Sequence, residues 1–470
     1  RVKRYPDIVQ EFFGPVQRAL LPRRWVLAGL LIGVLALVVG SIPLVTHLSS
    51  NASPTPVVDM ELPLKSSQAI TFAPTLTLTL APTPTPIVFP APLPDLPTSL
   101  LVLVTGAGDS IEELGLVSEL QRELGNTGSG GRVWNVDVST VGDADAALLE
   151  GKRRDALLVL WAERSTGGDY RLHASFPVSP AYRIPLLQEP AWVELSASKE
   201  HVQQLAVTCA LYASGQYERA YDWFQVIEPH YEDTEPVAEL ASLYWLWGNL
   251  ALRQDHRDLW QKGYDAYTRA IASLERDSPL LPDLYANRGL LQMYAANAIL
   301  AEPWDSRCVE QGRADFEEAY GLASVKQGDF LSGLGFIRLT CPDSDRDWQE
   351  LAVRDAHDAL SLTGESAMAL SLMARVRIEN LYDPELGNPL LVERDACQAL
   401  KLDPALIEPY FTLGELYRAN GRPDQARAAY MAYGQAALFE WQRRLARHGI
   451  EAIPSEVGNP TPGLDGCEPH

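Results

Sequence analysis

The sequence predicts a mainly α-helical protein whose C-terminal half is an α-solenoid, a stack of helical hairpins. Aromatic and small residues recur at helical spacing over about 200–448, residues 25–48 carry no charge, and strand and helix patterns alternate over 99–176. The expected order is a cytoplasmic basic tail 1–24, a transmembrane helix 25–48, a Pro/Thr-rich stalk 49–98, a small α/β domain 99–196, helical repeats with a terminal capping helix 197–448, and a flexible tail 449–470.

Composition limits the classes of partner and site. The chain has 470 residues, 46% of them apolar, enough for a core in each of two or three domains. A formal net charge of -22 argues against nucleic acid as a partner, because phosphate neutralisation needs a basic face. We expect no cofactor and no metal, since the cysteines form no CxxC pair and have no histidine nearby at ligand spacing: Cys209, Cys308, Cys341, Cys397 and Cys467.

The uncharged run 25–48 is the expected membrane anchor. As a helix it is long enough to cross a hydrocarbon core of about 30 Å and to contact the lipid bilayer. Basic residues outnumber acidic ones before it, which predicts a cytoplasmic N-terminus and a single-pass protein of the cell membrane whose later residues are extracytoplasmic. A signal peptide cleaved near Ser50 and Ala52 is the competing interpretation, but the apolar run is longer than a typical signal core.

Residues 49–98 follow as a linker rich in proline, threonine and serine. Proline fixes φ and lacks a backbone donor, so we expect an extended stalk without hydrogen-bonded structure. The strand-like alternation from Thr75 to Leu80 is flanked by prolines, which favours a solvated spacer over a paired strand.

Strand and helix patterns alternate after the stalk and predict a compact sheet with helices packed on it. Leu100 to Thr105 is a short apolar run bounded by glycine and proline, typical of a buried strand. The remaining expected elements are helices over 110–124 and 143–150 and strands over 132–138, 155–162 and 169–176.

Two glycines directly after the first expected strand invite a nucleotide-binding interpretation. The fingerprint for dinucleotides requires a small residue where Ile111 stands, and Asp109 would place a negative charge beside the phosphate, so Gly106 and Gly108 indicate a tight turn instead. The order of elements over 99–180 weakly resembles the N-terminal domain of TolB-type periplasmic proteins. That resemblance implies a protein-interaction domain outside the inner membrane.

The clearest helical hairpin lies over 404–430. Two helical patterns are separated by Gly421, and the small residues Gly414 and Ala426 would let the helices approach while aromatic side chains fill the gaps. This pattern resembles the tetratricopeptide repeat (TPR), whose hairpins need neighbours to bury their apolar faces. Similar spacing predicts five earlier units: 202–229, one around Trp247-Gly248, one from Tyr285 to Ala319, 328–362 and 366–403, with a polar capping helix over 435–448.

The resemblance to TPR proteins implies a right-handed superhelix whose concave groove, lined by the first helix of each unit, binds extended peptides or partner helices. The Lys/Asn/Arg pattern that clamps a C-terminal carboxylate in some members is absent, so we do not expect such a ligand. For each groove position, a solvent-facing or intra-array contact is the alternative. The residues that the resemblance places in the groove are Trp245, Asn249, Arg253, Arg375, Glu379, Phe411, Glu415 and Arg418.

Two cysteines carry a disulfide hypothesis. Cys308 and Cys341 lie in corresponding loops of adjacent units, and an oxidised pair is permitted outside the membrane. Closing that loop would contribute roughly 3–4 kcal/mol, and two free thiols are the alternative. Cys209 and Cys397 lie within helical patterns and are expected to be small core residues.

No catalytic arrangement emerges from the sequence. The histidines are isolated, and neither a Gly-x-Ser-x-Gly elbow nor an HExxH helix occurs, so we do not expect an enzyme. The predicted function is a membrane-anchored extracytoplasmic scaffold or adaptor that binds a protein or peptide partner in its groove. The alternatives are the sensor half of a transmembrane signalling receptor whose output domain lies upstream of Arg1, and a self-associating structural subunit of a cell-surface assembly.

Overall fold

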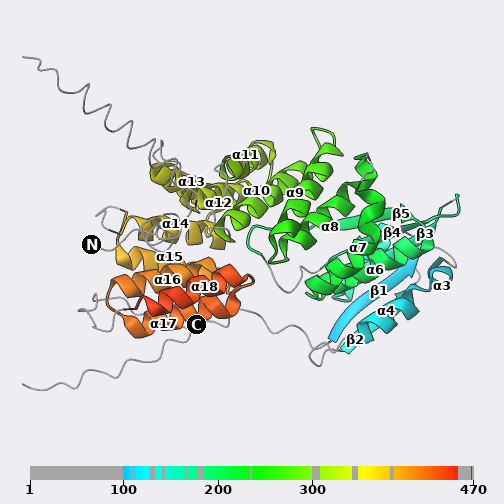
Figure 1. Ribbon diagram of the computed structural model, residues 1–470, viewed down its shortest axis with the longest axis horizontal. Coiled ribbons are helices and arrows are strands. Elements are labelled where there is room, and N and C mark those ends of the chain that lie inside the picture. Colours follow the sequence, from blue (N-terminus) through cyan, green and yellow to red (C-terminus); the bar gives the residue numbers. More distant parts are fainter. Residues whose placement is uncertain are drawn as a thin grey trace, which may run out of the picture. The chain divides into compact units, whose positions relative to one another are not determined.

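One sheet and a long series of helical hairpins make up the described chain (Figure 1), which confirms the prediction of a mainly helical, solenoid-like protein with a small sheet. The computed structural model describes residues 99–106, 110–125, 133–139, 143–165, 167–177, 184–232, 235–298, 307–340, 348–381, 386–453 and 467. The predicted basic tail, transmembrane helix 25–48 and stalk lie outside these residues. None of the helices within them is both long and apolar enough to span a bilayer.

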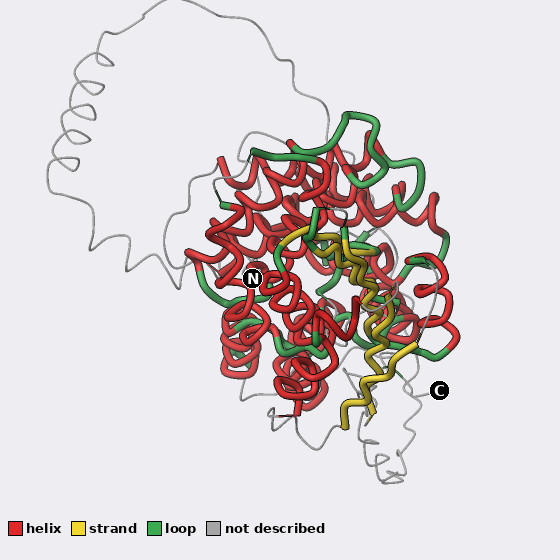
Figure 2. The backbone as a smooth tube through the Cα atoms, turned by 90° about the vertical axis from the view of Figure 1, so that its right-hand side faces the viewer, coloured by secondary structure: helices red, strands yellow, loops and turns green. Residues whose placement is uncertain are grey.

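Across the residues that the structure describes, the sheet has five strands in the order β2-β1-β3-β4-β5. β1 is parallel to both β2 and β3, whereas β3, β4 and β5 are antiparallel neighbours. Figure 2 shows the strands together in yellow beside the helices. The strands are β1 Ser99–Gly106, β2 Val133–Ser139, β3 Leu158–Arg164, β4 Tyr170–Ser175 and β5 Trp192–Ala197.

Alternate residues of the central strands face opposite sides of the sheet, as the two-residue period of a strand requires. Val102 and Leu160 belong to the main core, which the sheet shares with α4 (Leu116–Gly125) and α6 (Lys199–Ala213). Leu103 and Trp161 pack on the opposite side with α5 (Ala144–Arg153). The sheet is therefore covered on both faces, and the first helix of the array forms one of the covers.

Two details of this domain differ from the sequence prediction. The helix expected over 110–124 is divided into α3 (Ser110–Leu114) and α4 because Gly115 has a φ of 63°, which ends the first helix. Strand β5 was not predicted.

Gly106 is the last residue of β1. A Cβ atom at this position would lie 2.3 Å from the Ala162 carbonyl oxygen, so the close approach of β3 explains this glycine.

Within the described residues, the array consists of six consecutive helical hairpins, followed by α18 (Glu440–Glu451). The hairpins are α6 with α7 (Tyr217–Tyr231), α8 (Ala241–Leu252) with α9 (Arg257–Ala272), α10 (Leu281–Ala298) with α11 (Arg307–Leu322), α12 (Gln327–Thr340) with α13 (Trp348–Thr363), α14 (Ala367–Glu379) with α15 (Pro389–Leu402), and α16 (Glu408–Ala419) with α17 (Pro423–Ala436). The short 3-10 turn Ala238–Leu240 leads into α8.

The last hairpin shows how the pairs close. A Cβ atom at Gly414 would lie 2.6 Å from the Tyr430 ring, and Tyr430 is fully buried. Gly421 links α16 to α17 with a φ of 67°, a conformation that residues with a side chain rarely adopt. The absence of a side chain at Gly414 therefore leaves room for the Tyr430 ring of the partner helix.

The C-terminal end differs from the prediction of a capping helix ending at 448 and a free tail. α18 continues to Glu451, and Ile450 and Ile453 pack against the C-terminal core. Cys467 forms a disulfide with Cys397 of α15, with the two Cα atoms 5.2 Å apart. The expectation that Cys397 is simply a small core residue was wrong, whereas Cys209 is a buried free thiol. The pairing proposed for Cys308 and Cys341 lies outside the described side chains.

Candidate functional site: the inner face of the array

The first helices of successive hairpins contact one another in the order α8, α10, α12, α14 and α16. We call the surface formed by these five helices the inner face. Part of it is covered by residues 184–189, which belong to the connection between β4 and β5 and which we call the cis segment. The inner face therefore already holds one stretch of polypeptide, supplied by the same chain.

The main chain of Gln188 is the most closely held part of the cis segment. Its N–H donates to Oδ1 of Asn287 over 2.8 Å, and its carbonyl oxygen accepts from Nδ2 of the same asparagine over 2.7 Å. Trp245 Nε1 and Asn249 Nδ2 donate to that carbonyl, each over 3.1 Å. Because these bonds go to main-chain atoms, they would hold a residue of any type except proline at this position.

Glu189 is the charged anchor of the cis segment. Arg253 Nη2 donates to Glu189 Oε1 over 2.5 Å, and Asn249 Nδ2 donates to Glu189 Oε2 over 2.8 Å. The Arg253 guanidinium lies over the rings of Tyr212 and Tyr217, 5.3 and 4.3 Å from their centroids. Burial raises the pKa of Tyr212 well above its ordinary value, so its hydroxyl remains a donor, and it donates to Glu189.

The asparagines that hold Gln188 are themselves fixed by other buried groups. Asn249 Oδ1 accepts from Tyr267 Oη over 2.7 Å and from Asn287 Nδ2 over 3.0 Å. Asn249 and Asn287 are both fully buried. A satisfied network of this kind sets the orientation of both amides, and the acceptor and donor of Asn287 are consequently aligned with the main chain that it holds.

The eight predicted groove residues fall into two groups. Trp245 and Asn249 on α8, and Arg253 at its C-terminal cap, contact the cis segment. The other five lie on α14 and α16. Their charged members pair within their own helices, Arg375 with Glu379 over 2.6 Å and Arg418 with Glu415 over 2.5 Å, while the Arg375 guanidinium lies 5.3 Å from the centroid of the Phe411 ring.

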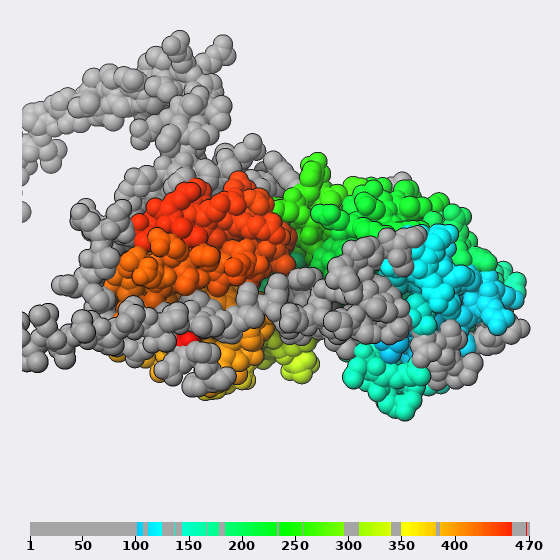
Figure 3. Space-filling model, turned by 90° about the horizontal axis from the view of Figure 1, so that it is seen from below, coloured from blue at the N-terminus to red at the C-terminus, as the bar shows by residue number. Residues whose placement is uncertain are grey.

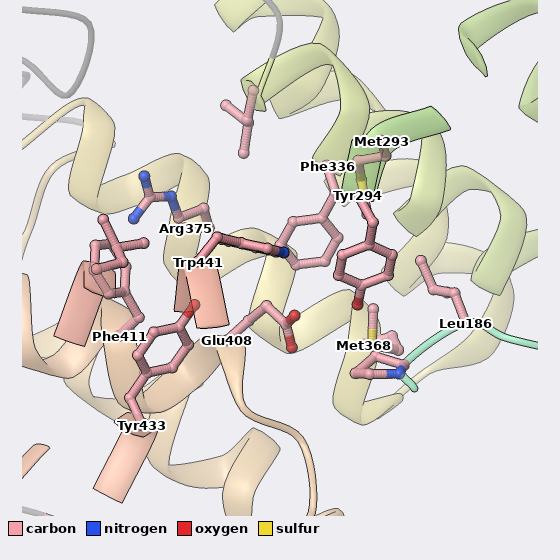
Figure 4. Close-up of a pocket in the computed structure, with 13 residues that line it drawn as sticks. Leu186, Met293, Tyr294, Phe336, Met368, Arg375, Glu408, Phe411, Tyr433 and Trp441 are labelled. Atoms are coloured by element: carbon pink, nitrogen blue, oxygen red, sulfur yellow. The ribbon is translucent and has the colours of Figure 1, made fainter. Parts of the chain in front are cut away.

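A cavity of about 100 Å³ lies beside this second group (Figure 4). We call it the aromatic pocket, because five of its side chains carry aromatic rings. Tyr294 comes from α10, Phe336 from α12, Phe411 from α16, Tyr433 from α17 and Trp441 from α18. The remaining lining residues are Pro185, Leu186, Met293, Leu339, Met368, Arg375, Glu408 and Leu445.

Two polar atoms of the aromatic pocket are enclosed and have no hydrogen-bond partner among the described residues: Glu408 Oε2 and Trp441 Nε1. Figure 4 shows the Glu408 carboxyl group among Trp441, Tyr294 and Tyr433. Burial raises the pKa of Glu408 to about 7, and the charge of Asp403 acts in the same direction. Burial, followed by the Glu408 charge, also raises the pKa of Tyr294.

α18 supplies two of the residues that line the aromatic pocket, Trp441 and Leu445, and Phe439 packs directly before this helix. The ring of Phe439 lies 5.3 Å from Tyr294 and 6.3 Å from Trp260, centroid to centroid, and stacks on Trp441. The Glu440 N–H donates to Asp255 Oδ2 over 2.6 Å. Figure 3 shows the red surface of the C-terminal helices meeting the green surface of the middle of the chain. The terminal helix therefore contacts the second hairpin as well as the last.

The sequence matches no protein-family model and no curated protein. The site must therefore be interpreted from its own chemistry. Across the part of the chain that the structure describes, no three His, Cys, Asp or Glu side chains are grouped as metal ligands. The inner face instead contains side chains that hydrogen-bond the main chain of Gln188. It also contains an aromatic pocket with an enclosed carboxyl group, and both features are suited to binding.

Proposed function

We propose that this chain is a membrane-anchored, extracytoplasmic scaffold that binds a segment of a partner protein on the inner face of its TPR-like repeats. One observation supports this most strongly: Asn287 holds both main-chain groups of Gln188. An inner face that hydrogen-bonds the main chain of its own segment has the chemistry that an extended partner segment requires.

The occupied and open parts of the inner face suggest where the partner binds. The cis segment covers the part near α8 and α10, through Gln188 and Glu189. The aromatic pocket follows along α12, α14 and α16, and Leu186 of the cis segment lines it. A partner segment placed there would continue along the face from the cis segment, with one side chain in the pocket as its anchor.

Two further observations support the proposed location. Residues 25–48 carry no charge and follow a basic stretch, as in a membrane anchor with a cytoplasmic N-terminus. Cys397 and Cys467 form a disulfide, a bond that persists in oxidising compartments and is rare in the cytosol. Both are consistent with repeats that work outside the cytoplasm.

Selection of displayed random peptides on the purified full chain tests this proposal. Leu445 lines the aromatic pocket, whereas Met431 is exposed on α17 and is not among the pocket residues. We expect a family of related peptides to be enriched, with binding lost in Leu445→Arg and retained in the matched control Met431→Arg. No enriched family, or equal loss in both variants, would contradict the proposal. Binding only to a second copy of the chain would indicate a structural assembly instead.

A further inference from the structure

The aromatic pocket combines an apolar wall with one acidic group, Glu408, for which the described residues provide no cationic partner. Met293, Phe336 and Met368 offer apolar surface, and Tyr294, Tyr433 and Trp441 offer rings around the Glu408 carboxyl. Ring faces attract cations, and a buried carboxylate without a partner is unfavourable until a cation or a donor reaches it. The residues therefore favour an apolar ligand that ends in a positive charge.

The surrounding charges point the same way. A second cavity, of about 420 Å³, shares Pro185, Leu186 and Met368 with the aromatic pocket and is lined by Asp329 and Asp403. The two cationic side chains of these cavities have anionic partners already: Arg375 pairs with Glu379, and Lys326 pairs with Asp283. A cation that enters the aromatic pocket would therefore be the counter-ion of Glu408.

The size of the cavity limits the ligand. Its volume of about 100 Å³ is comparable to that of engineered cavities of about 150 Å³ that hold one benzene molecule. An unbranched stem of four methylenes with an ammonium group has nearly as many heavy atoms as benzene. The side chains of arginine and tryptophan have more heavy atoms than benzene and would require the pocket walls to move.

The second unpartnered atom distinguishes a free amine from an amino-acid residue. The Trp441 Nε1–H needs an acceptor, and an ammonium group has only donors. A lysine residue supplies both groups, because its ammonium can reach a carboxylate while its main-chain carbonyl accepts a hydrogen bond. A free alkylamine would leave the indole N–H unsatisfied.

We propose that the aromatic pocket binds a lysine side chain of the partner segment, with the ammonium on Glu408, the stem between Met293, Phe336 and Met368, and a main-chain carbonyl on Trp441. This inference rests on the proposed function, since it names the anchor residue of the protein partner. It assigns Glu408 and Trp441 as binding residues, neither of which was among the groove positions expected from the sequence.

The test uses the full chain and two matched probes, Nα-acetyl-lysine N-methylamide and its uncharged analogue Nα-acetyl-norleucine N-methylamide, followed by ligand-observed NMR at pH 8. We expect the lysine probe to bind at least about tenfold more tightly, as a charge-assisted hydrogen bond implies. Glu408→Gln should remove that preference, whereas Glu350→Gln, at an exposed position of α13, should leave it unchanged. Equal binding of the two probes, or a preference that survives Glu408→Gln, would overturn the inference.

A third probe, n-butylamine, tests the part assigned to Trp441. Trp441→Phe keeps an aromatic ring but removes the N–H, so it should weaken the lysine probe severalfold more than n-butylamine, which loses only part of the attraction between its ammonium and the ring. An equal effect on both probes would contradict that assignment.

The two proposals can also fail separately. Selected peptides that lack lysine but depend on Leu445 would overturn this inference alone, whereas binding of the lysine probe without any selected peptide would contradict the proposed function alone.

Discussion

Asn287 and Gln188 are 99 residues apart in sequence, yet the side-chain amide of one bonds both main-chain groups of the other. This contact ties the connection between two sheet strands to the third hairpin of the array. It also fixes the orientation of the cis segment, whose Leu186 lines the aromatic pocket. The asparagine therefore has a structural effect beyond its own helix.

Replacing Asn287 with alanine should release the cis segment. The Gln188 N–H would lose its acceptor and Asn249 would lose a neighbour in the buried network, so we expect the free energy of unfolding to fall by about 2–3 kcal/mol. Exchange of the Gln188 amide hydrogen should accelerate at the same time. Gln188→Ala is the control, because it keeps the main-chain bonds and removes only side-chain contacts such as that to Lys326. Equal losses in the two variants would contradict the importance of the main-chain contact.

Gly414→Ala should separate α16 from α17. The added Cβ would lie 2.6 Å from the fully buried Tyr430 ring, and overpacking of this kind typically costs about 1–3 kcal/mol. Gly321→Ala is a matched control in α11, where a Cβ would meet nothing within 4 Å. There the gain in helix propensity should stabilise the protein by about 0.5–1 kcal/mol. Chemical unfolding measures both effects, and a stabilising Gly414→Ala would show that the approach of these helices is looser than described.

Glu408 should make the protein less stable as the pH rises. Its pKa is about 7 in the folded chain against an ordinary value of 4.5, so the folded state binds more protons than the unfolded state between these values. The free energy of unfolding contributed by this group therefore falls across that interval, by about 3–4 kcal/mol in total. Glu408→Gln should accordingly be more stable than the wild type at pH 8 but not at pH 4.5.

The comparison between variant and wild type is needed because other groups titrate in the same range. Burial also raises the pKa of Asp355, to about 6, which contributes a loss of the same sign. Subtracting the free energy of unfolding of the wild type from that of the variant at each pH removes this common contribution. Glu350→Gln, at an exposed position, should show no such pH-dependent difference. A difference between Glu408→Gln and wild type that is constant from pH 4.5 to 8 would argue that the carboxyl group is not enclosed.

The disulfide between Cys397 and Cys467 should be found in the mature protein. Mass spectrometry of non-reduced peptides should detect the linked pair, and Cys467→Ser should lower the free energy of unfolding by about 2–4 kcal/mol, because the bond closes a long loop. The same spectra examine the hypothesis that Cys308 and Cys341 are paired. Complete alkylation of Cys397 and Cys467 without reduction would contradict the described bond.

The sequence predicted the features that depend on neighbouring residues. The helical spacing around Gly414 and Tyr430 identified the last hairpin, and the apolar run from Leu100 identified β1. β5 could have been found in the same way, because burial alternates along Trp192–Ala197 as in a half-buried strand. The division of the helix at Gly115 required a positive φ, which a glycine permits but does not demand.

The site depends on contacts that no local pattern specifies. Trp245, Asn249 and Arg253 were placed on a groove by repeat position, but nothing near them in sequence indicated that Gln188 and Glu189 would lie there. Asn287 gave only a weak indication, an amide that follows the apolar residues Tyr285 and Ala286 in α10. Glu408 looks like an ordinary acid in the first turn of a helix, and its enclosure results from α10, α17 and α18 meeting around it.

Site-specific photo-cross-linking in the cells that produce the protein tests the central claim most directly. A benzophenone amino acid would replace Leu445 at the aromatic pocket or, as the control, exposed Met431 on the adjacent helix. We predict that position 445 gives an adduct with one partner protein, that the cross-link maps to a single segment containing lysine, and that position 431 does not give it. The absence of any adduct at position 445, or the same adducts at both positions, would contradict a partner-binding inner face.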